Sequence, residues 1–502
     1  MKSIWNAHSH SEDYPSLEHD TAADVAIIGG GITGISIAKL LAQKGIKVVL
    51  LESHKIAGSA SGHSTGNLYL TIDQNLYTLK DKYNSDVVRK VASSRMQALD
   101  KIEAWVTDNK FECGFKNVPF YLYSNEEIGC IKIGREFQAG KEAGLPFSNA
   151  EPDQIPFPHK KAVLIPRQHQ INPMQYVQEL ARSVEKTDCR IYENSPVESV
   201  EENEKNYILH TSKAKIEAKY VVHATHSPKG IKIVQSLLGP YREYGIACRV
   251  SDSNMRDAIF WGYHEDGEKF STRTYTNTKG EQFLIVVGQP HKVGQAKDNL
   301  SHLHKLEEFA KRYFDVEEVV YRWSGQNFQP ADLLPYIGPV NAGSSEYIAT
   351  GYSTDGLVYG TLAAMIISDA IVGKENEWAL LYDSTRNQPF KSATEFIKEN
   401  ANLAKCILVD YLNPIGEDKM SDLEPGEGGV FSKDGHRIAV RRTKQGDLEA
   451  VSAVCTHMKC IVHWNNGEKS WDCPCHGSRF AANGEVIEGP AFHPLKAIEI
   501  QR

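Results

Sequence analysis

The stretch from Cys455 to Phe480 reads C-T-H-M-K-C-I-V-H-W-N-N-G-E-K-S-W-D-C-P-C-H-G-S-R-F, and the interpretation of the chain begins there. It contains two short groups of metal-binding side chains, Cys455-x-His457 and Cys473-x-x-His476. Fifteen residues separate the groups, which is enough for a strand, a turn and a returning strand. The chain could therefore bring two thiolates and two imidazoles to one point.

The pattern C-T-H-x-x-C followed by C-P-C-H-G-S-x-F resembles the Rieske family, in which histidines replace cysteines on one iron of a [2Fe–2S] cluster. The resemblance implies that Cys455 and Cys473 bind one iron. It implies that His457 and His476 bind the other. A structural zinc site could use the same side chains. A zinc finger, however, keeps its two cysteines and its two histidines in separate pairs, whereas each pair here mixes the two types.

Three further residues of this stretch match the same family. The resemblance implies a disulfide between Cys460 and Cys475 that clamps the two cluster loops, and a zinc site would leave both cysteines unexplained. It also implies that the Ser478 hydroxyl donates a hydrogen bond to a cluster sulfur. Such a bond raises the reduction potential of the cluster, because the reduced form is more negative.

Composition places the chain among globular proteins and excludes several classes of function. It has 502 residues, 41% of them apolar, so we expect two to four domains. The formal net charge of −8 does not suggest a nucleic-acid partner. No stretch is long and apolar enough to predict a transmembrane segment, and the first residues carry no apolar signal core. We therefore expect a cytoplasmic protein.

A dinucleotide-binding pattern opens the chain. Residues 24–29 form a short apolar run that suits a buried parallel strand. The motif G-x-G-x-x-G follows at Gly29, Gly31 and Gly34, then a helical pattern and a second strand that ends on Glu52. In this order the elements form the Rossmann fingerprint, in which the glycines admit the pyrophosphate and the acid takes the ribose hydroxyls.

Later segments favour FAD over NAD, because they resemble the D-amino-acid-oxidase-like flavoprotein family. They are the loop at 59–67, the strands at 194–197 and 220–226, and the glycine-rich stretch at 347–360 with an alanine-rich helix at 361–372. Some relatives tether FAD through a histidine, so His63 is a candidate attachment point or a polar neighbour of the cofactor. The resemblance implies FAD contacts at Gly29, Gly31, Ile32, Thr33, Gly34, Glu52, Ser61, Gly62, His63, Val197, Thr225, Gly351, Gly356 and Leu357.

The resulting fold class is an α/β FAD-binding domain of Rossmann type with an α+β substrate layer, followed by a small all-β Rieske domain. The substrate layer is expected to be mainly helical in its first part and mainly strands in its second. We expect the flavoprotein at 1–388 (FAD-binding parts at about 20–75, 150–235 and 320–375, substrate layer at about 75–150 and 235–320), a helix and linker at 389–428, and the Rieske domain at 429–502.

Candidate catalytic residues come from the strands of the substrate layer. In the oxidase-like family an arginine on this sheet can hold a substrate carboxylate through two parallel hydrogen bonds, and Arg273 is the candidate here. The alternative is an exposed arginine on a strand. Tyr244, Tyr275, His291 and His63 are further candidates. Flavin-dependent amine oxidation needs an aligned C–H bond and a neutral amine, so no catalytic triad is expected.

Together the two cofactors predict an FAD-dependent enzyme that oxidises a C–N bond of an amine or amino-acid-like substrate. Flavin accepts two electrons as a hydride, whereas the cluster takes one at a time and would pass each to an unidentified electron carrier. Two alternatives remain: a reductive flavoenzyme fed through the cluster, and a redox sensor without turnover. The sequence also leaves open whether flavin and cluster meet within one chain or across a homo-oligomer.

Overall fold

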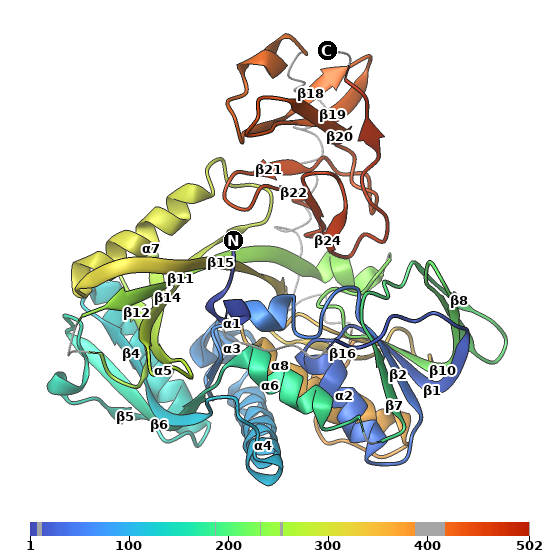
Figure 1. Cartoon of the computed structure of the whole chain (residues 1–502). Coiled ribbons are helices and arrows are strands. Elements are labelled where there is room, and N and C mark those ends of the chain that lie inside the picture. The colour runs from blue at the N-terminus through green and yellow to red at the C-terminus, as the bar shows by residue number, and fades with distance from the viewer. Residues whose placement is uncertain (8–12, 186, 231, 252–254, 387–416, 501–502) are drawn as a thin grey trace.

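A larger unit with two sheets and a smaller all-β unit make up the protein (Figure 1). The smaller unit, formed by the C-terminal residues, lies against the larger one at the top of the view. Of the helix and linker expected at 389–428, residues 389–416 lie outside the described residues. The computed structural model describes residues 1–7, 13–185, 187–230, 232–251, 255–386 and 417–500.

The first sheet of the larger unit has the strand order β16-β17-β10-β1-β2-β7. Its strands are parallel except β16, and the antiparallel strands β9 and β8 extend it from β10. All of β2 is buried, as is the second half of β1, as expected for parallel strands covered on both faces. The bounds are β1 Thr21–Ile28, β2 Val48–Leu51, β7 Cys189–Tyr192, β8 Ser199–Glu202, β9 Tyr207–His210, β10 Lys215–His223, β16 Tyr336–Pro339 and β17 Glu346–Thr350.

Two apolar helices cover the glycine-loop end of this sheet. Helix α2 (Ile32–Ala42) begins directly after the glycine loop, and it packs against α8 (Gly356–Ile371). The sequence predicted the second helix at 361–372, but it begins at Gly356. The start of α8 lies against the start of α2, where Gly360 comes close to Thr33.

The second sheet is mixed and has the order β15-β11-β14-β13-β12-β4-β6-β3, with β5 paired to β6. Its bounds are β3 Asn67–Leu68, β4 Lys116–Ser124, β5 Ser148–Asn149, β6 Lys161–Gln170, β11 Leu238–Val250, β12 Ile259–Tyr263, β13 Lys269–Thr276, β14 Gln282–Lys292 and β15 Val316–Pro330. The other helices of this unit are α1 Ile4–Ala7, α3 Leu76–Lys82, α4 Ser85–Asn109, α5 Glu127–Glu142, α6 Pro173–Arg182, α7 Leu300–Tyr313 and α9 Ala379–Tyr382.

The substrate layer is mainly helical at 75–150 and mainly strands at 235–320, as predicted, but each part also contains an element of the other kind. The segment at 75–150, predicted as mainly helical, contains strand β4, which pairs with both β6 and β12. The segment at 235–320, predicted as strands, contains helix α7, which packs on β11 and β14. Both elements are stabilised by contacts with segments that are distant in the sequence. The local hydrophobic periodicity carries no information about such contacts. The predicted hairpin is present as β13 and β14.

The smaller unit consists of two four-stranded sheets, β18-β19-β20-β25 and β21-β22-β23-β24. The two segments that carry the Cys and His groups are the loops from β20 to β21 and from β22 to β23. Trp471 and Phe480 fill the core behind these loops. The bounds are β18 Gly428–Lys433, β19 His436–Arg442, β20 Leu448–Ser452, β21 His463–Asn465, β22 Ser470–Asp472, β23 Arg479–Ala481, β24 Val486–Glu488 and β25 Ala497–Ile498.

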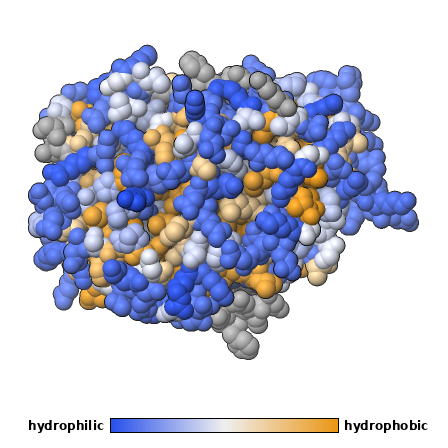
Figure 2. All heavy atoms as spheres, turned by 90° about the horizontal axis from the view of Figure 1, so that it is seen from below, coloured by the Kyte–Doolittle hydropathy of each residue, from blue (hydrophilic) through white to orange (hydrophobic). Residues whose placement is uncertain are grey.

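On the face seen from below, the surface is typical of a globular protein. There, hydrophilic residues (blue) interrupt the hydrophobic ones (orange) over the whole view (Figure 2). A few large apolar side chains are exposed, Ile128 and Leu380 among them, which is normal for a folded chain. Among the described helices, none combines the length and the apolar character needed to cross a bilayer.

Candidate active site and cluster site

A large cavity, of about 510 Å³, opens at the carboxyl ends of β1 and β2 and extends beneath the mixed sheet. Ligands of open parallel sheets bind at this edge. Most of the residues predicted to contact FAD line the cavity, and Gly34, Gly62 and Gly351 do not. Those in the wall are Gly29, Gly31, Ile32, Thr33, Glu52, Ser61, His63, Val197, Thr225, Gly356 and Leu357.

The glycines of the first loop divide into two roles. A side chain on Gly34 would place its Cβ 1.9 Å from the carbonyl oxygen of Gly29, so this glycine lets α2 pack on β1. Gly29 has a φ of +112°, a conformation that only glycine adopts readily. A Cβ on Gly31 would meet only the Ser61 hydroxyl, at 3.0 Å. Gly31 therefore leaves the backbone open to a ligand in the cavity.

The Glu52 carboxylate is held at the end of β2 by the surrounding backbone. It accepts hydrogen bonds from the amides of Gly30 (2.7 Å) and His54 (2.9 Å) and from the Ser53 hydroxyl (3.1 Å). The N-terminus of α2 faces the same cavity, and the Ile32 amide donates to Ser61 Oγ at 3.0 Å. An oriented acid beside a helix N-terminus suits a dinucleotide, whose ribose and pyrophosphate would take these two groups.

The candidate catalytic residues divide into those that line the cavity and those that lie outside its wall. Tyr244 and His63 line the cavity, whereas Arg273, Tyr275 and His291 do not. The guanidinium of Arg273 is buried and donates to the backbone carbonyls of Thr274, Thr65 and Ile171. Arg273 is therefore neither exposed nor in the cavity wall, and its guanidinium binds backbone carbonyls where the prediction had a substrate carboxylate.

The other candidates outside the cavity also have internal partners. Tyr275 receives a hydrogen bond from Asn172 and packs edge-on against Trp5. His291 stacks on His302, with 4.1 Å between ring centroids. His63, which lines the cavity together with Tyr244, donates a hydrogen bond from Nδ1 to the Ser59 carbonyl oxygen, at 2.8 Å.

Sequence reasoning missed a charged group beneath the mixed sheet, made of Asp73, Glu243 and Lys269. Lys269 Nζ lies 2.9 Å from Asp73 Oδ1 and 3.8 Å from the centre of the Trp261 ring. Burial raises the pKa of Glu243 to about 8, and the nearby Asp73 carboxylate adds to this while Lys269 opposes it. No motif joins these residues, because they come from a loop and two strands.

The predicted cluster ligands meet between the two loops of the smaller unit. The thiols of Cys455 and Cys473 lie close enough to interact, and this interaction, with backbone amides and Ser478, lowers the pKa of Cys455 to about 7. The rings of His457 and His476 lie 5.1 Å apart. Nδ1 of His476 is buried and has no hydrogen-bond partner among the described residues. Two adjacent thiols and an imidazole nitrogen without a partner fit a [2Fe–2S] cluster of Rieske type.

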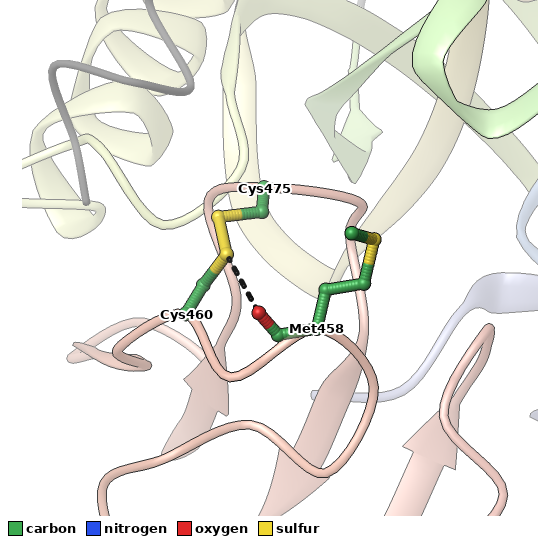
Figure 3. Close-up of a disulfide and its surroundings, with 3 residues drawn as sticks. All are labelled: Met458, Cys460 and Cys475. Atoms are coloured by element: carbon green, nitrogen blue, oxygen red, sulfur yellow. Dashed lines mark hydrogen bonds between the residues drawn. A yellow bond between two sulfur atoms is a disulfide. The ribbon is translucent and has the colours of Figure 1, made fainter. Parts of the chain in front are cut away.

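The two cluster loops are joined by a disulfide between Cys460 and Cys475 (Figure 3), as the family resemblance implied. The carbonyl oxygen of Met458 lies 3.9 Å from Cys460 Sγ. The sulfur of Cys473 is also close to the pair, so that three sulfur ligand atoms lie within 4.8 Å of one another. Because the disulfide uses two of them, only Cys473 of the three is available to a metal.

The cluster loops lie directly on the larger unit. His457 Nε2 is 3.2 Å from the carbonyl oxygen of Gly230, and the Gln326 side chain donates to the Gly477 carbonyl at 2.8 Å. The smaller unit also completes the wall of the cavity. Its contributing residues are Glu485, Val486, Ile487, Glu488, Gly489, Phe492 and Pro494.

A buried ion network joins the units beside these contacts. Glu468 of the smaller unit pairs with Arg242 of β11 and, at 2.9 Å, with Arg479. Arg479 also contacts Asp472 at 3.1 Å and Glu488 at 3.4 Å. Although burial alone would raise the pKa of Glu468, the two guanidinium groups hold it well below its usual range.

A Rossmann-type cavity beneath a mixed sheet, joined to a site of two cysteines and two histidines, defines a flavoprotein oxidoreductase with an iron–sulfur centre. Comparison with known families agrees. The model described as FAD dependent oxidoreductase matches residues 24–370, and the Rieske [2Fe-2S] domain model matches 415–499. The chain belongs to the FAD-dependent oxidoreductase family and carries a C-terminal Rieske domain, and its cofactors are FAD and a [2Fe–2S] cluster.

Several known proteins resemble the chain over most of its length. YhfW of Bacillus subtilis, which its name describes as a Rieske 2Fe-2S iron-sulfur protein, is 29% identical over 99% of this chain and 98% of its own. Gamma-glutamylputrescine oxidoreductase of Escherichia coli is 22% identical over 75% of this chain and 89% of its own. Glycine oxidase of Geobacillus kaustophilus has a similar structure, with a TM-score of 0.59 and 18% identity over 73% of this chain and 99% of its own.

Proposed function

We propose that this enzyme oxidises a C–N bond of an amine or amino-acid-like substrate and passes the electrons, one at a time, through its Rieske cluster to an external carrier. Bound FAD would supply the two-electron acceptor and the cluster the one-electron acceptor. The names of two relatives, a gamma-glutamylputrescine oxidoreductase and a glycine oxidase, support this class of substrate.

One observation carries the relay: the cluster loops contact the unit that contains the flavin cavity, within one chain. The His457 ring reaches the Gly230 carbonyl, and residues 485–489 form part of the cavity wall. A hydrogen-bonded contact between the two sites would give electrons a short route between them. An enzyme that delivered its electrons directly to oxygen would have no need of such a contact.

Each residue's proposed part follows from its position. Gly31 and the N-terminus of α2 would admit the pyrophosphate, and Glu52 would bind the ribose. The first turn of α8 would lie beside the flavin ring, where the positive end of its dipole favours a reduced, anionic ring. The cluster would be held by Cys455, His457, Cys473 and His476, with Ser478 as the hydrogen-bond donor to sulfur.

An anaerobic titration with candidate amines tests the proposal. The flavin absorbance should bleach first, and the electron-paramagnetic signal of the reduced cluster should follow. The variant Cys473→Ser should still bleach but give no cluster signal, because a thiolate ligand is lost. If the wild-type flavin is reduced while the cluster stays oxidised, the relay is wrong.

A further inference from the structure

The end of the cavity beneath the mixed sheet carries the charged group of Asp73, Glu243 and Lys269. The Lys269 ammonium also donates a hydrogen bond to the backbone carbonyl oxygen of Asp73, at 3.0 Å. The backbone amide of Asp73 donates to the Asp355 carboxylate at 3.1 Å. Asp355 directly precedes α8, so the charged group lies beside the segment that would contact the flavin ring. The acid at the other end, Glu52, would bind the ribose. A substrate would therefore meet the charged group and not Glu52.

Glu243 differs from its neighbours because its carboxylate has no hydrogen-bond partner among the described residues. It lies on β11 opposite Gly325 of β15, which also lines the cavity. With no side chain at Gly325, the space beside Glu243 stays open. The charges of Asp73 and Lys269 cancel through their 2.9 Å contact. An ionised Glu243 leaves this end of the cavity with one uncompensated negative charge.

The same end of the cavity offers little to a substrate carboxylate. No arginine is found among the described residues of the cavity wall, and Arg273 binds backbone carbonyls elsewhere. Lys269 is already engaged with Asp73. The remaining lysine in the wall, Lys229, donates to the Ala491 carbonyl of the smaller unit and senses the charge of Glu52, so it belongs to the nucleotide end.

We propose that Glu243 binds the ammonium group of the substrate and accepts its proton, so that the preferred substrates are cationic amines without an α-carboxylate. The inference rests on the proposed function and specifies its substrate. Trp261, whose ring lies against Lys269, would contact the carbon chain beside the amine.

The proton balance of this step is simple. One N–H bond of R-CH2-NH3+ breaks and one O–H bond forms on Glu243, which leaves R-CH2-NH2 and a neutral carboxyl group. The neutral amine can then lose hydride from its carbon to the flavin. The raised pKa of Glu243, about 8, brings it closer to that of an alkylammonium, so the transfer is less unfavourable than to an ordinary glutamate.

Binding of an inert cation to the flavin-loaded enzyme tests the site without turnover. Butyltrimethylammonium has no N–H bond, and butanoate has the opposite charge; the flavin absorption spectrum reports either one. We expect the cation to bind and butanoate not to. Binding should weaken as the pH falls below about 8, because Glu243 becomes neutral. The charged groups that face it, Asp73 and Lys269, are paired with each other at 2.9 Å.

The variant Glu243→Gln keeps the shape of the side chain and removes its charge. We expect cation binding to weaken by about tenfold to a hundredfold and its dependence on pH near 8 to disappear. Glu318→Gln, an exposed glutamate on β15, is the matched control and should bind like the wild type. Unchanged binding by Glu243→Gln, or a wild type that prefers butanoate, would overturn the inference.

The two proposals can fail separately. If the cation binds through Glu243 but no amine reduces the flavin, the cation site stands and the proposed function falls. If amines reduce the flavin of Glu243→Gln with the wild-type dependence on concentration and pH, the role of Glu243 falls and the proposed function stands.

Discussion

Replacing Glu468 by glutamine should loosen the contact between the flavin unit and the Rieske unit. Arg479 would keep Asp472 and Glu488 as partners. Arg242 would keep only the Ser324 hydroxyl, at 2.5 Å, because its Nε and Nη1 atoms have no partner among the described residues. Glu468→Gln would therefore leave one buried guanidinium without its ion-pair partner.

The size of the effect follows from the burial of this pair. Breaking a buried ion pair on one side costs about 3–5 kcal/mol. We take the lower end, about 3 kcal/mol, because a glutamine oxygen can still accept a hydrogen bond and only Arg242 is left unpaired. This free energy corresponds to a change of about 150-fold in the equilibrium between docked and separated units.

Stopped-flow reduction by a substrate amine separates the two steps affected. In Glu468→Gln, the flavin should bleach at the wild-type rate while reduction of the cluster is delayed. Calorimetry should show the Rieske unit unfolding at a lower temperature than the flavin unit. The control is Glu449→Gln, which removes an exposed ion pair with Arg441 inside the Rieske unit and should change neither result. Wild-type cluster reduction in Glu468→Gln would refute the docking argument.

Two more predictions concern the flavin unit. Gly34→Ala should give protein that folds poorly or purifies without flavin absorbance, because the new Cβ would lie 1.9 Å from the Gly29 carbonyl oxygen, which a rigid backbone cannot avoid. Burial would raise the pKa of Glu346, but hydrogen bonds from His223 and Lys232, both 2.6 Å, lower it to about 2. The free energy of unfolding should therefore be higher above about pH 4.3, the usual value for glutamate, and fall as the pH drops toward 2; Glu346→Gln should flatten this dependence.

Local motifs explain why both cofactors were predicted from the sequence. The Cys and His groups occupy one stretch of the chain, and the glycine loop lies between its strand and its helix, so spacing alone defines each site. The family comparisons confirm FAD and the Rieske cluster. The individual ligands remain predictions, although the structure brings the two cysteines together and leaves His476 Nδ1 free to bind.

The substrate end could not be predicted in the same way. Arg273 and Lys269 lie on the same strand, β13, and an even spacing puts both on one face of the sheet. The cavity does not reach Arg273, whose guanidinium lies 5.5 Å from the centre of the Trp5 ring. The extent of the cavity along β13 can be seen only in the tertiary structure. Glu243 on β11 comes near Asp73 and Lys269 only in the folded chain, so no local pattern joins these residues.

The shared wall of the cavity has a consequence for how the enzyme is assembled. A flavin seated against both Val486 and the glycine loop would be held by two units of the chain at once. The C-terminal lobe would then serve the enzyme twice, as part of the seat of its coenzyme and as the route by which electrons leave it.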